Sequence, residues 1–346
     1  MTDNPLVSIC IPTYNRADMV GKAIESALDQ TYQNIEVIVV DNASTDNTEE
    51  IVASYDDPRL KYFGNDENVG IFGNFNRCID LYNGDFLHIL HSDDFISLDF
   101  TEKCVDFFET HPNVFLTFTA TKTIEMGHMT LISKGDINYI LSAPEGFKKI
   151  LSNGNFISCP SVMVRNGLHE RYGNFPLNYK YSGDYYQWLK ISKNYDIGYI
   201  CDTYLYYVSG THSETYRLKT CNIQGYQDSL NIVSNIKNTL GSEINDYSME
   251  INLALYRLIN ECISSFFHQL GVKKLINPID LLDVAFKGWS KLLYINWKES
   301  FKKIKYLIII LFSYIIVTFY FTRCLTEKLW NSSSFQIFKF ALKKLR

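Results

Sequence analysis

The chain has 346 residues and 46% of them are hydrophobic, so it can bury a sizeable core and is not a disordered tail. Its net charge of −5 divides into +8 over residues 298–346 and −13 over the 297 residues before them. This acidic majority disfavours nucleic acid as a partner.

Residues 6–11 predict a first buried strand, because a β-branched apolar run ends there at a proline. A helix with one apolar face follows over residues 20–28, with Asp18 as its N-cap, and a second buried strand covers residues 36–41. Asp46 begins another helix in a capping-box-like pattern. The other predicted elements are strands over residues 60–63, 86–90, 113–120 and 198–208 and helices over residues 74–81 and 100–111. Such alternation predicts an α/β fold with a mostly parallel sheet and helices on both faces.

The pattern changes to a helical one at about residue 226. Residues 306–322 are uncharged and lie at the lower limit of about 17 to 25 residues for a membrane span. A buried helix or strand pair is the alternative, but basic residues on both sides and a basic amphipathic pattern over residues 335–346 favour association with a membrane. We therefore expect three regions: an α/β domain (1–225), a helical accessory region (226–297) and a basic, apolar membrane-associating segment (298–346).

The eight cysteines form no C-x-x-C pair that would indicate a zinc or redox site, so a reducing compartment fits them best. The first residues, MTDNP, lack the positive start and apolar run of a secretory signal. These features predict a protein that stays in the cytoplasm.

Two adjacent carboxylates, Asp93 and Asp94, follow the buried strand 86–90. Ligands of open α/β sheets bind at the carboxyl ends of the strands, where this pair is expected to lie. Paired carboxylates are suitable ligands for Mg²⁺ or Mn²⁺ on a diphosphate, and a cation would offset the cost of burying them. The alternative is that Asp93 caps the next helix and Asp94 is solvated.

Other polar residues are predicted at the same edge of the sheet. Asp41 could accept hydrogen bonds from a nucleobase or ribose, or it could cap the following helix. Tyr14 could stack on a base and Arg16 could face a phosphate.

Five stretches, VSICIPTYNR, QTYQNIEVIVVDNASTDNT, ENVGIFGNFNRCI, GDFLHILHSDDF and SGDYYQWLKI, occur in the order and at the spacing of family 2 glycosyltransferases. Residues 5–215 thus resemble the inverting bacterial enzymes with the glycosyltransferase A fold. The resemblance implies that Pro12, Tyr14 and Asp41 hold the nucleotide base. It also implies that Asp93 and Asp94 bind the ribose and a divalent metal, Mn²⁺ or Mg²⁺.

The resemblance further implies that Asp184 is the catalytic base and that His212 lies near the metal or the diphosphate. Inversion needs one group to take the proton of the acceptor hydroxyl, and a single carboxylate suffices. On position alone, Asp184 could instead be a helix N-cap. The chain departs from the family at two places: His91 stands where an acid is common, and Gly183 stands where a Glu often precedes the catalytic Asp.

The expected function is that of an enzyme on the cytoplasmic face of the cell membrane. It would transfer a hexose or N-acetylhexosamine from a UDP-sugar to a lipid-linked saccharide of a bacterial surface polysaccharide, such as O-antigen or capsule. The alternative is a non-catalytic nucleotide-sugar-binding scaffold subunit, which the intact Asp93, Asp94 and Asp184 disfavour. A nucleotidyltransferase or a dinucleotide-dependent dehydrogenase would need a glycine-rich loop after the first strand, and PTYNRAD has no glycine.

Overall fold

The computed structural model describes residues 4–132, 134–210, 224–271 and 287. The contacts divide the chain into two compact units, Met1–Lys219 and Thr220–Arg346. The predicted boundaries at residues 225 and 297 stay a prediction.

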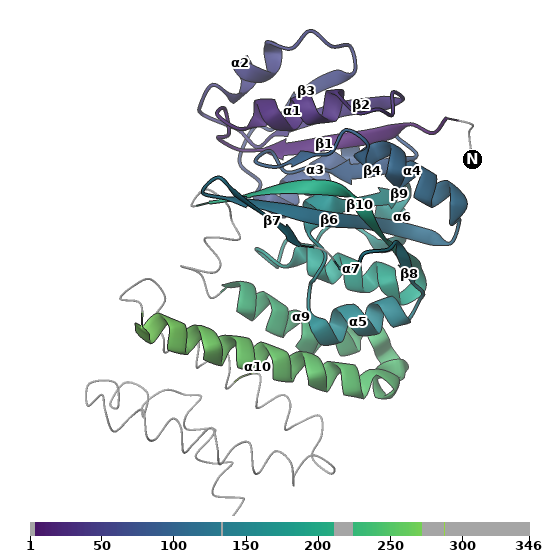
Figure 1. Ribbon diagram of the computed structural model, residues 1–346. Helices are drawn as coiled ribbons and strands as arrows, with labels where there is room; N and C mark the ends of the chain where they lie inside the picture. The colour runs from purple at the N-terminus through teal and green to yellow at the C-terminus, as the bar shows by residue number, and fades with distance from the viewer. Residues whose placement is uncertain (1–3, 133, 211–223, 272–286, 288–346) are drawn as a thin grey trace, which may run out of the picture. The chain divides into compact units, whose positions relative to one another are not determined.

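The first unit is built on a ten-stranded sheet with the order β3-β2-β1-β4-β9-β6-β10-β5, in which β7 pairs with β6 and β8 with β10 (Figure 1). Its strands are β1 (Val7–Thr13), β2 (Ile35–Asp41), β3 (Leu60–Gly64), β4 (Phe86–Ile89), β5 (Phe95–Ile96), β6 (Val114–Glu125), β7 (His128–Ile132), β8 (Tyr139–Leu141), β9 (Val162–Arg165) and β10 (Asp196–Ser209).

The sheet is mixed, which corrects the expectation of a mostly parallel one. Strands β3, β2, β1 and β4 are parallel to one another, and β6 is parallel to β10. Strand β9 enters antiparallel between β4 and β6, and β5, β7 and β8 are antiparallel to their partners. Every residue of β1, β2 and β4 is buried, because helices cover both faces of the strands.

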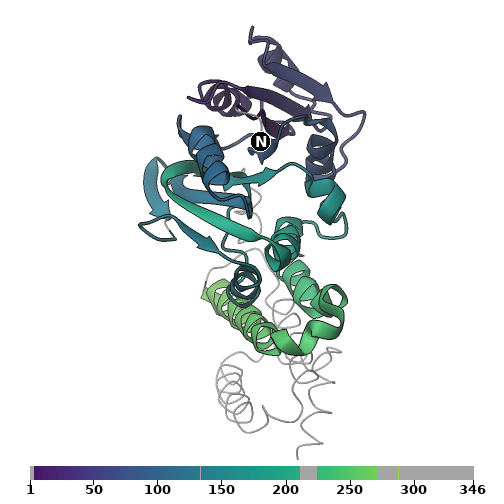
Figure 2. The same cartoon turned by 90° about the vertical axis from the view of Figure 1, so that its right-hand side faces the viewer.

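Helices lie on both sides of the strands, as the turned view shows (Figure 2). Helices α1 and α4 bury their apolar residues in one hydrophobic core with alternate residues of β1 and β2. Helix α3 packs on the other face, where the Asn74 amide donates to the Val40 carbonyl (2.9 Å). The helices of this unit are α1 (Val20–Leu28), α2 (Thr48–Ala53), α3 (Ile71–Leu81), α4 (Phe100–Thr110), α5 (Glu145–Asn153), α6 (Leu168–Tyr172) and α7 (Gly183–Asn194), with the 3-10 helix η1 (Cys159–Ser161).

Both predicted helix caps are displaced by one residue. The N-cap of α1 is Met19, so the prediction of Asp18 is wrong. The N-cap of α2 is Asn47, but Asp46 still accepts hydrogen bonds from the Thr48 backbone N–H (3.1 Å) and hydroxyl (2.5 Å). Asp46 therefore stabilises the start of α2 from just outside the helix.

The described part of the second unit is helical, as predicted, with α9 (Gln224–Leu240), the 3-10 helix η2 (Gly241–Tyr247) and α10 (Ser248–Gly271). Among the described residues, none of the helices has the length and apolar character needed to cross a bilayer. The predicted membrane segment over residues 306–322 lies outside the described residues, as does His212.

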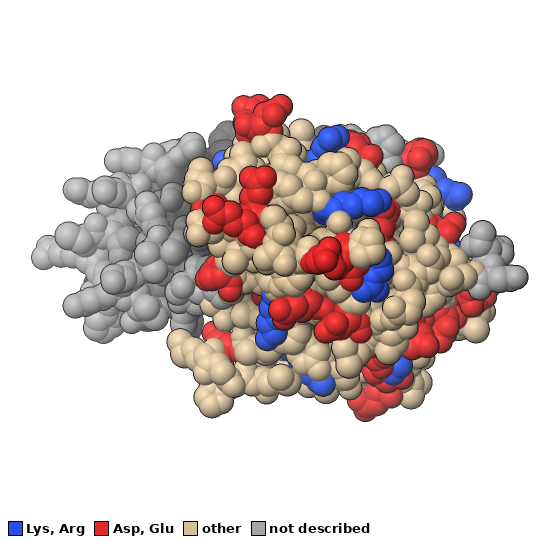
Figure 3. All heavy atoms as spheres, turned by 90° about the horizontal axis from the view of Figure 1, so that it is seen from above, with Lys and Arg blue, Asp and Glu red and all other residues tan. Residues whose placement is uncertain are grey.

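The surface above α2 and β3 carries acidic side chains with basic ones among them (Figure 3). Among the side chains coloured there, the acidic ones predominate and the basic ones form no broad patch of the kind that attracts a polyanion.

Candidate active site

The site lies at the point where the strand order reverses. From β1 the chain proceeds to β2 on one side, and β4 later pairs with β1 on the other side. The carboxyl ends of β1, β2 and β4 meet at this edge, where α/β sheets bind their ligands. Predicted site residues follow all three strands, so the topology brings together Tyr14, Asp41 and the acid pair Asp93 and Asp94.

Asp94 is the buried member of the pair. Its residue is 1% exposed, and its Oδ1 atom accepts a hydrogen bond from the Val208 N–H of β10 (2.8 Å). Its Oδ2 atom is buried with no hydrogen-bond partner among the described residues. Burial, with the negative charge of Asp93, raises the pKa of the Asp94 carboxyl well above its usual range.

His91 joins the two carboxylates, which the sequence did not predict. One potential ligand atom from each of His91, Asp93 and Asp94 lies within 4.8 Å of the other two. The His91 Nδ1 atom is 3.8 Å from the orphaned Oδ2 atom of Asp94. Burial lowers the pKa of His91, and the charge of Asp93 opposes that shift. The group therefore combines two carboxylates with an imidazole that favours its neutral form.

This cluster fits a divalent cation. A buried carboxylate oxygen without a partner is costly, and a cation would satisfy it. Two acidic side chains and an imidazole are an ordinary donor set for Mn²⁺ and related ions. The residues that would hold the ion are thus Asp93 and Asp94, with His91 beside them.

The loops that follow β1 and β2 are fastened to each other. The Asn15 N–H donates to Ser44 Oγ (2.8 Å), and the Asn15 Oδ1 atom accepts from the Thr45 N–H (2.8 Å). Asn15 has a φ of 51°, a left-handed conformation that Asn tolerates better than most residues. The two loops therefore form one preformed wall beside the acid pair.

Three predicted nucleotide-site residues lie on the β1 side of this wall. Pro12 is buried within β1, and Tyr14 follows the strand with 43% of its surface exposed. Arg16 is half-buried, and its guanidinium donates to the Asn15 carbonyl oxygen (3.2 Å). Tyr14 is thus the ring of this group that is open to a planar ligand.

Asp41 is placed at the same edge, but its oxygens already have partners. Its Oδ1 atom accepts from the Ser44 N–H (3.0 Å) and hydroxyl (2.6 Å), and its Oδ2 atom accepts from the Tyr62 hydroxyl (2.8 Å). Burial and this hydrogen bond raise the pKa of Tyr62. Asp41 caps the turn at Ser44, and a ligand would have to share its carboxylate with these groups.

Asp184 lies in the first turn of α7, whose N-cap is Ser182, so the alternative that Asp184 is the N-cap is wrong. Its Oδ2 atom accepts from the Asn155 amide (2.7 Å), and its Oδ1 atom accepts from the Tyr185 N–H (2.7 Å). Burial raises the pKa of Asp184 to about 6, while both hydrogen bonds oppose the shift. A carboxyl group with this pKa is mostly ionised at neutral pH and can still accept a proton.

Cys159 of η1 is half-buried. Burial raises the pKa of its thiol, and the negative charges of Asp184 and Asp94 add to that shift. Asn155 could not be found from the sequence, because it lies 29 residues along the chain from its partner Asp184. The His-x-Asp spacing of His91 and Asp93 was a visible signal that could have revealed His91.

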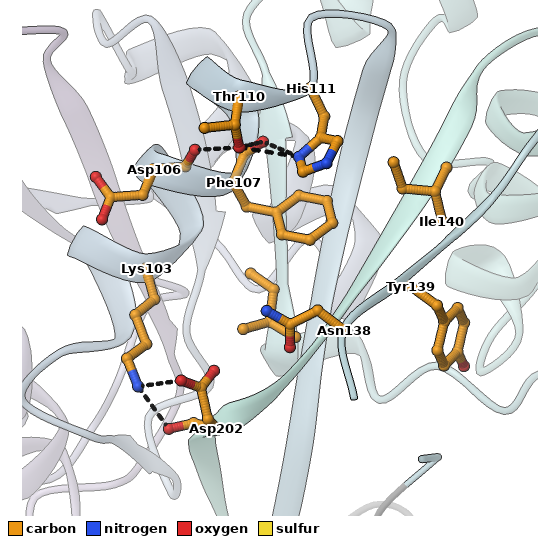
Figure 4. Close-up of a pocket in the computed structure, with 10 residues that line it drawn as sticks. Lys103, Asp106, Phe107, Thr110, His111, Asn138, Tyr139, Ile140 and Asp202 are labelled. Atoms are coloured by element: carbon orange, nitrogen blue, oxygen red, sulfur yellow. Dashed lines mark hydrogen bonds and ion pairs between the residues drawn. The ribbon is translucent and has the colours of Figure 1, made fainter. Parts of the chain in front are cut away.

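A separate pocket of about 560 Å³ is lined by residues of α4, of β8 and the residue before it, and of β10 (Figure 4). In it the Lys103 ammonium pairs with the Asp202 carboxylate (2.6 Å), and the Phe107 ring stacks on His111 (4.4 Å between centroids). None of its lining residues is a predicted site residue.

Residues 8–173 match the profile described as Glycosyl transferase family 2. An Escherichia coli protein, "UDP-Glc:alpha-D-GlcNAc-diphosphoundecaprenol beta-1,3-glucosyltransferase WfgD", is 31% identical over 209 residues, which are 58% of this chain and 78% of that protein. A second Escherichia coli enzyme of the same description, WfaP, is 32% identical over 54% of this chain and 70% of its own length. These matches define the class of the protein, which is a glycosyltransferase. The chain belongs to glycosyl transferase family 2.

Solved structures share the fold. TarS of S. aureus (residues 1–349) in complex with UDP-GlcNAc has a TM-score of 0.65 at 20% identity, over 82% of this chain and 81% of that one. The mannosyltransferase PcManGT of Pyrobaculum calidifontis, with GDP-Man and Mn²⁺, has a TM-score of 0.53 at 16% identity, over 85% and 86% of the two chains. The α/β fold expected from the sequence is therefore confirmed, with a mixed sheet.

Proposed function

We propose that this protein is an inverting glycosyltransferase that transfers a hexose or N-acetylhexosamine from a UDP-sugar to a lipid-linked saccharide of a bacterial surface polysaccharide. The observation that carries the proposal is that potential ligand atoms of His91, Asp93 and Asp94 lie within 4.8 Å of one another, and the buried Oδ2 atom of Asp94 has no hydrogen-bond partner among the described residues. The same unit contains Asp184, a separate carboxylate suited to take a proton.

Asp184 is the base in this proposal. It removes the proton from the acceptor hydroxyl as that oxygen bonds to the anomeric carbon, while the bond from this carbon to the diphosphate oxygen breaks on the opposite face. The Asn155 amide, which donates to Asp184 Oδ2, holds the carboxylate in place. A pKa of about 6 leaves Asp184 ionised before the reaction and able to accept a proton during it.

Asp93 and Asp94 bind the donor on the other side of the site. When bound there, a divalent cation neutralises the charge that develops on the departing diphosphate. Asp94 is fixed by the Val208 N–H, so its second oxygen keeps a constant position. Asp93 is also the residue proposed to contact the donor ribose, and His212 is a further proposed ligand.

The uracil base lies against the wall formed by the loops after β1 and β2. Tyr14 offers an exposed ring for stacking, and Asp41 offers a carboxylate whose lone pairs are shared with Ser44 and Tyr62. Pro12 supports this wall from β1, and Arg16 is placed to meet a phosphate. The names of WfgD and WfaP specify UDP-Glc, and TarS binds UDP and UDP-GlcNAc, which supports uridine in the donor.

In this proposal, the nature of the acceptor determines where in the cell the enzyme acts. The names of WfgD and WfaP specify a saccharide on diphosphoundecaprenol, a lipid carrier. A lipid-linked acceptor requires the enzyme at a membrane surface, and the basic, apolar residues 298–346 would bring it to the cytoplasmic face.

The proposal is tested by incubating the full chain with a diphosphate-linked N-acetylglucosamine acceptor and one donor at a time: UDP-glucose, UDP-N-acetylglucosamine or GDP-mannose. Mass spectrometry should detect an acceptor extended by one sugar with a UDP-sugar, with a β-linkage by NMR. Extension with GDP-mannose alone, or retention of the donor's anomeric configuration, would contradict it.

A further inference from the structure

His91 places an imidazole nitrogen beside Asp94, at a position where the family resemblance predicts an acid. We propose that His91 supplies an imidazole ligand next to Asp93 and Asp94 and makes the site selective for a transition ion such as Mn²⁺ over Mg²⁺. This inference rests on the proposed function, since it assumes that a cation binds at the acid pair.

The distances fit a shared cation. Ligand bonds of about 2.0 to 2.2 Å place two donors of one ion about 3 to 4 Å apart. The His91 Nδ1 and Asp94 Oδ2 atoms are 3.8 Å apart, which is too long for a hydrogen bond. The three potential ligand atoms lie within 4.8 Å of one another. One ion could therefore contact all three side chains after small rotations.

Asp94 gives the second, independent indication of a ligand. Its side chain is fully buried, one oxygen is held by the Val208 N–H, and the other faces His91 with no hydrogen-bond partner among the described residues. A direct hydrogen bond to His91 would have satisfied that oxygen without an ion. The observed separation leaves the oxygen available for a cation.

The imidazole is also held in position. The Phe75 ring of α3 lies against His91, with 5.5 Å between the ring centroids. The metal-facing groups are thus fixed by α3 on one side and by β10, through Val208, on the other. Ligands fixed before binding lose little conformational freedom when the ion arrives.

The chemistry of the donors sets the choice of ion. Mg²⁺ prefers oxygen ligands in near-ideal octahedral geometry, whereas imidazole favours first-row transition ions. An acid at position 91 would give an all-oxygen set, which suits Mg²⁺ and Mn²⁺ alike. With His91 in that position, the site gains affinity for Mn²⁺ relative to Mg²⁺.

Calorimetry tests the selectivity. Mn²⁺ and Mg²⁺ are titrated into the full chain in the presence of UDP, and the same is done with His91→Asp, His91→Gln and the control His128→Asp, which changes an exposed histidine of β7. His91→Asp should lower the ratio of Mn²⁺ to Mg²⁺ affinity about tenfold or more, with a smaller fall for His91→Gln. The control should keep the wild-type ratio. An unchanged ratio in folded His91→Asp overturns the inference.

Electron spin-echo spectroscopy of bound Mn²⁺ tests the ligand directly, because a coordinated imidazole gives a nitrogen modulation. His212→Gln serves as the background, so that any imidazole signal from that predicted ligand is removed. The modulation should persist in His212→Gln and disappear when His91→Gln is added. Its absence from His212→Gln alone, or its persistence in the double variant, rejects His91 as a ligand.

These variants distinguish a wrong role for His91 from a wrong metal site in the proposed function. If Asp94→Asn loses Mn²⁺ while the His91 variants keep the wild-type ratio, only the role of His91 is wrong. If Asp93→Asn and Asp94→Asn both bind Mn²⁺ as the wild type does, the metal site of the proposed function is wrong as well.

Discussion

Gly183 packs directly against the ring of Phe72. A Cβ atom at Gly183 would lie 2.8 Å from two carbons of that ring, closer than real Cβ contacts come. Phe72 in turn stacks on Phe175, with 5.7 Å between centroids, so the ring has little room to move. This contact gives a physical reason why the chain has Gly rather than Glu before Asp184: the ring occupies the space that a side chain would need.

Gly183→Ala should destabilise the protein, although Ala is favoured over Gly in helices by about 1 kcal/mol. Overpacking typically costs about 1 to 3 kcal/mol, so the clash outweighs the propensity. Urea denaturation should show the loss, and Phe72→Leu in the same chain should recover part of it. Gly64→Ala is the control, because its Cβ would come no closer than 3.7 Å to the ring and hydroxyl of Tyr62, an ordinary contact. If Gly183→Ala and the wild type are equally stable, the Phe72 ring moves aside to make room for the Ala side chain.

Asp184→Asn should reduce turnover by about 10² to 10⁴, the usual contribution of a general base, while the affinity for UDP stays within a few-fold. The Asn side chain keeps the shape but cannot take a proton. Glu145→Gln is a matched control, because Glu145 also lies in the first turn of a helix and is exposed. Steady-state rates and UDP titrations separate the two effects. Full turnover in Asp184→Asn would reject the base assignment.

The pH profile should follow the ionisation of Asp184. Since the base must be deprotonated and its pKa is about 6, kcat/KM should rise about tenfold per pH unit below that value and level off above it. The Asn155 amide lowers the pKa of Asp184, so Asn155→Leu should move the midpoint to higher pH. The nearby exposed Asn153→Leu should leave it in place. A midpoint that does not respond to Asn155→Leu would show that another group sets the profile.

Asp94→Asn should stabilise the metal-free protein while it weakens metal binding. The raised pKa of Asp94 means that the native state holds this proton more tightly than the unfolded chain does. Stability therefore falls as the pH rises from the carboxyl's ordinary pKa through its raised pKa in the native state, and the cost is fully present above the latter. Removing the charge should raise the free energy of unfolding by about 1 kcal/mol or more. Asp93→Asn, which is less buried, should gain less. A loss of stability in Asp94→Asn with chelator present would contradict this cost.

Removing residues 299–346 should shift the protein from the membrane to the soluble fraction. Anionic lipid attracts each Lys or Arg near its surface by about 1 kcal/mol, and this segment contains many of them. Flotation with purely zwitterionic vesicles measures the apolar contribution to binding, and the additional binding to anionic vesicles measures the contribution of charge. An unchanged distribution after truncation would refute a membrane role for this segment.

Much of the fold was predictable where local pattern and burial agree. The strands β1, β2 and β4 are continuous apolar runs, and α1 has a single apolar face, so each was found within one or two residues. Strand β7 is exposed at every residue and has no apolar alternation to detect. Strand β9 joins β4 to β6 across long stretches of chain, and local patterns do not encode such a pairing. This insertion, together with the antiparallel strands β5, β7 and β8, makes the sheet mixed where a mostly parallel one was expected.

The site was predictable to the extent that its residues follow strands. Asp93 and Asp94 lie a few residues beyond the end of β4, so the edge they occupy was clear from the sequence. The contacts that shape the cluster come from distant parts of the chain: Val208 of β10 donates a hydrogen bond to Asp94, and Phe75 of α3 packs against His91. Because these contacts depend on tertiary packing, the sequence left open whether Asp94 is buried or solvated, and its orphaned oxygen could not be foreseen.

The most direct test is a thermal-shift comparison of the wild type with Asp93→Asn/Asp94→Asn, each with UDP, Mn²⁺, both or neither. A ligand present at 100 times its Kd stabilises the native state by about 2.7 kcal/mol, so UDP with Mn²⁺ should raise the wild-type Tm by about 5 °C or more. The double variant should show little of this combined shift. An equal shift in both proteins would contradict the assignment of Asp93 and Asp94 as the residues that hold the metal diphosphate.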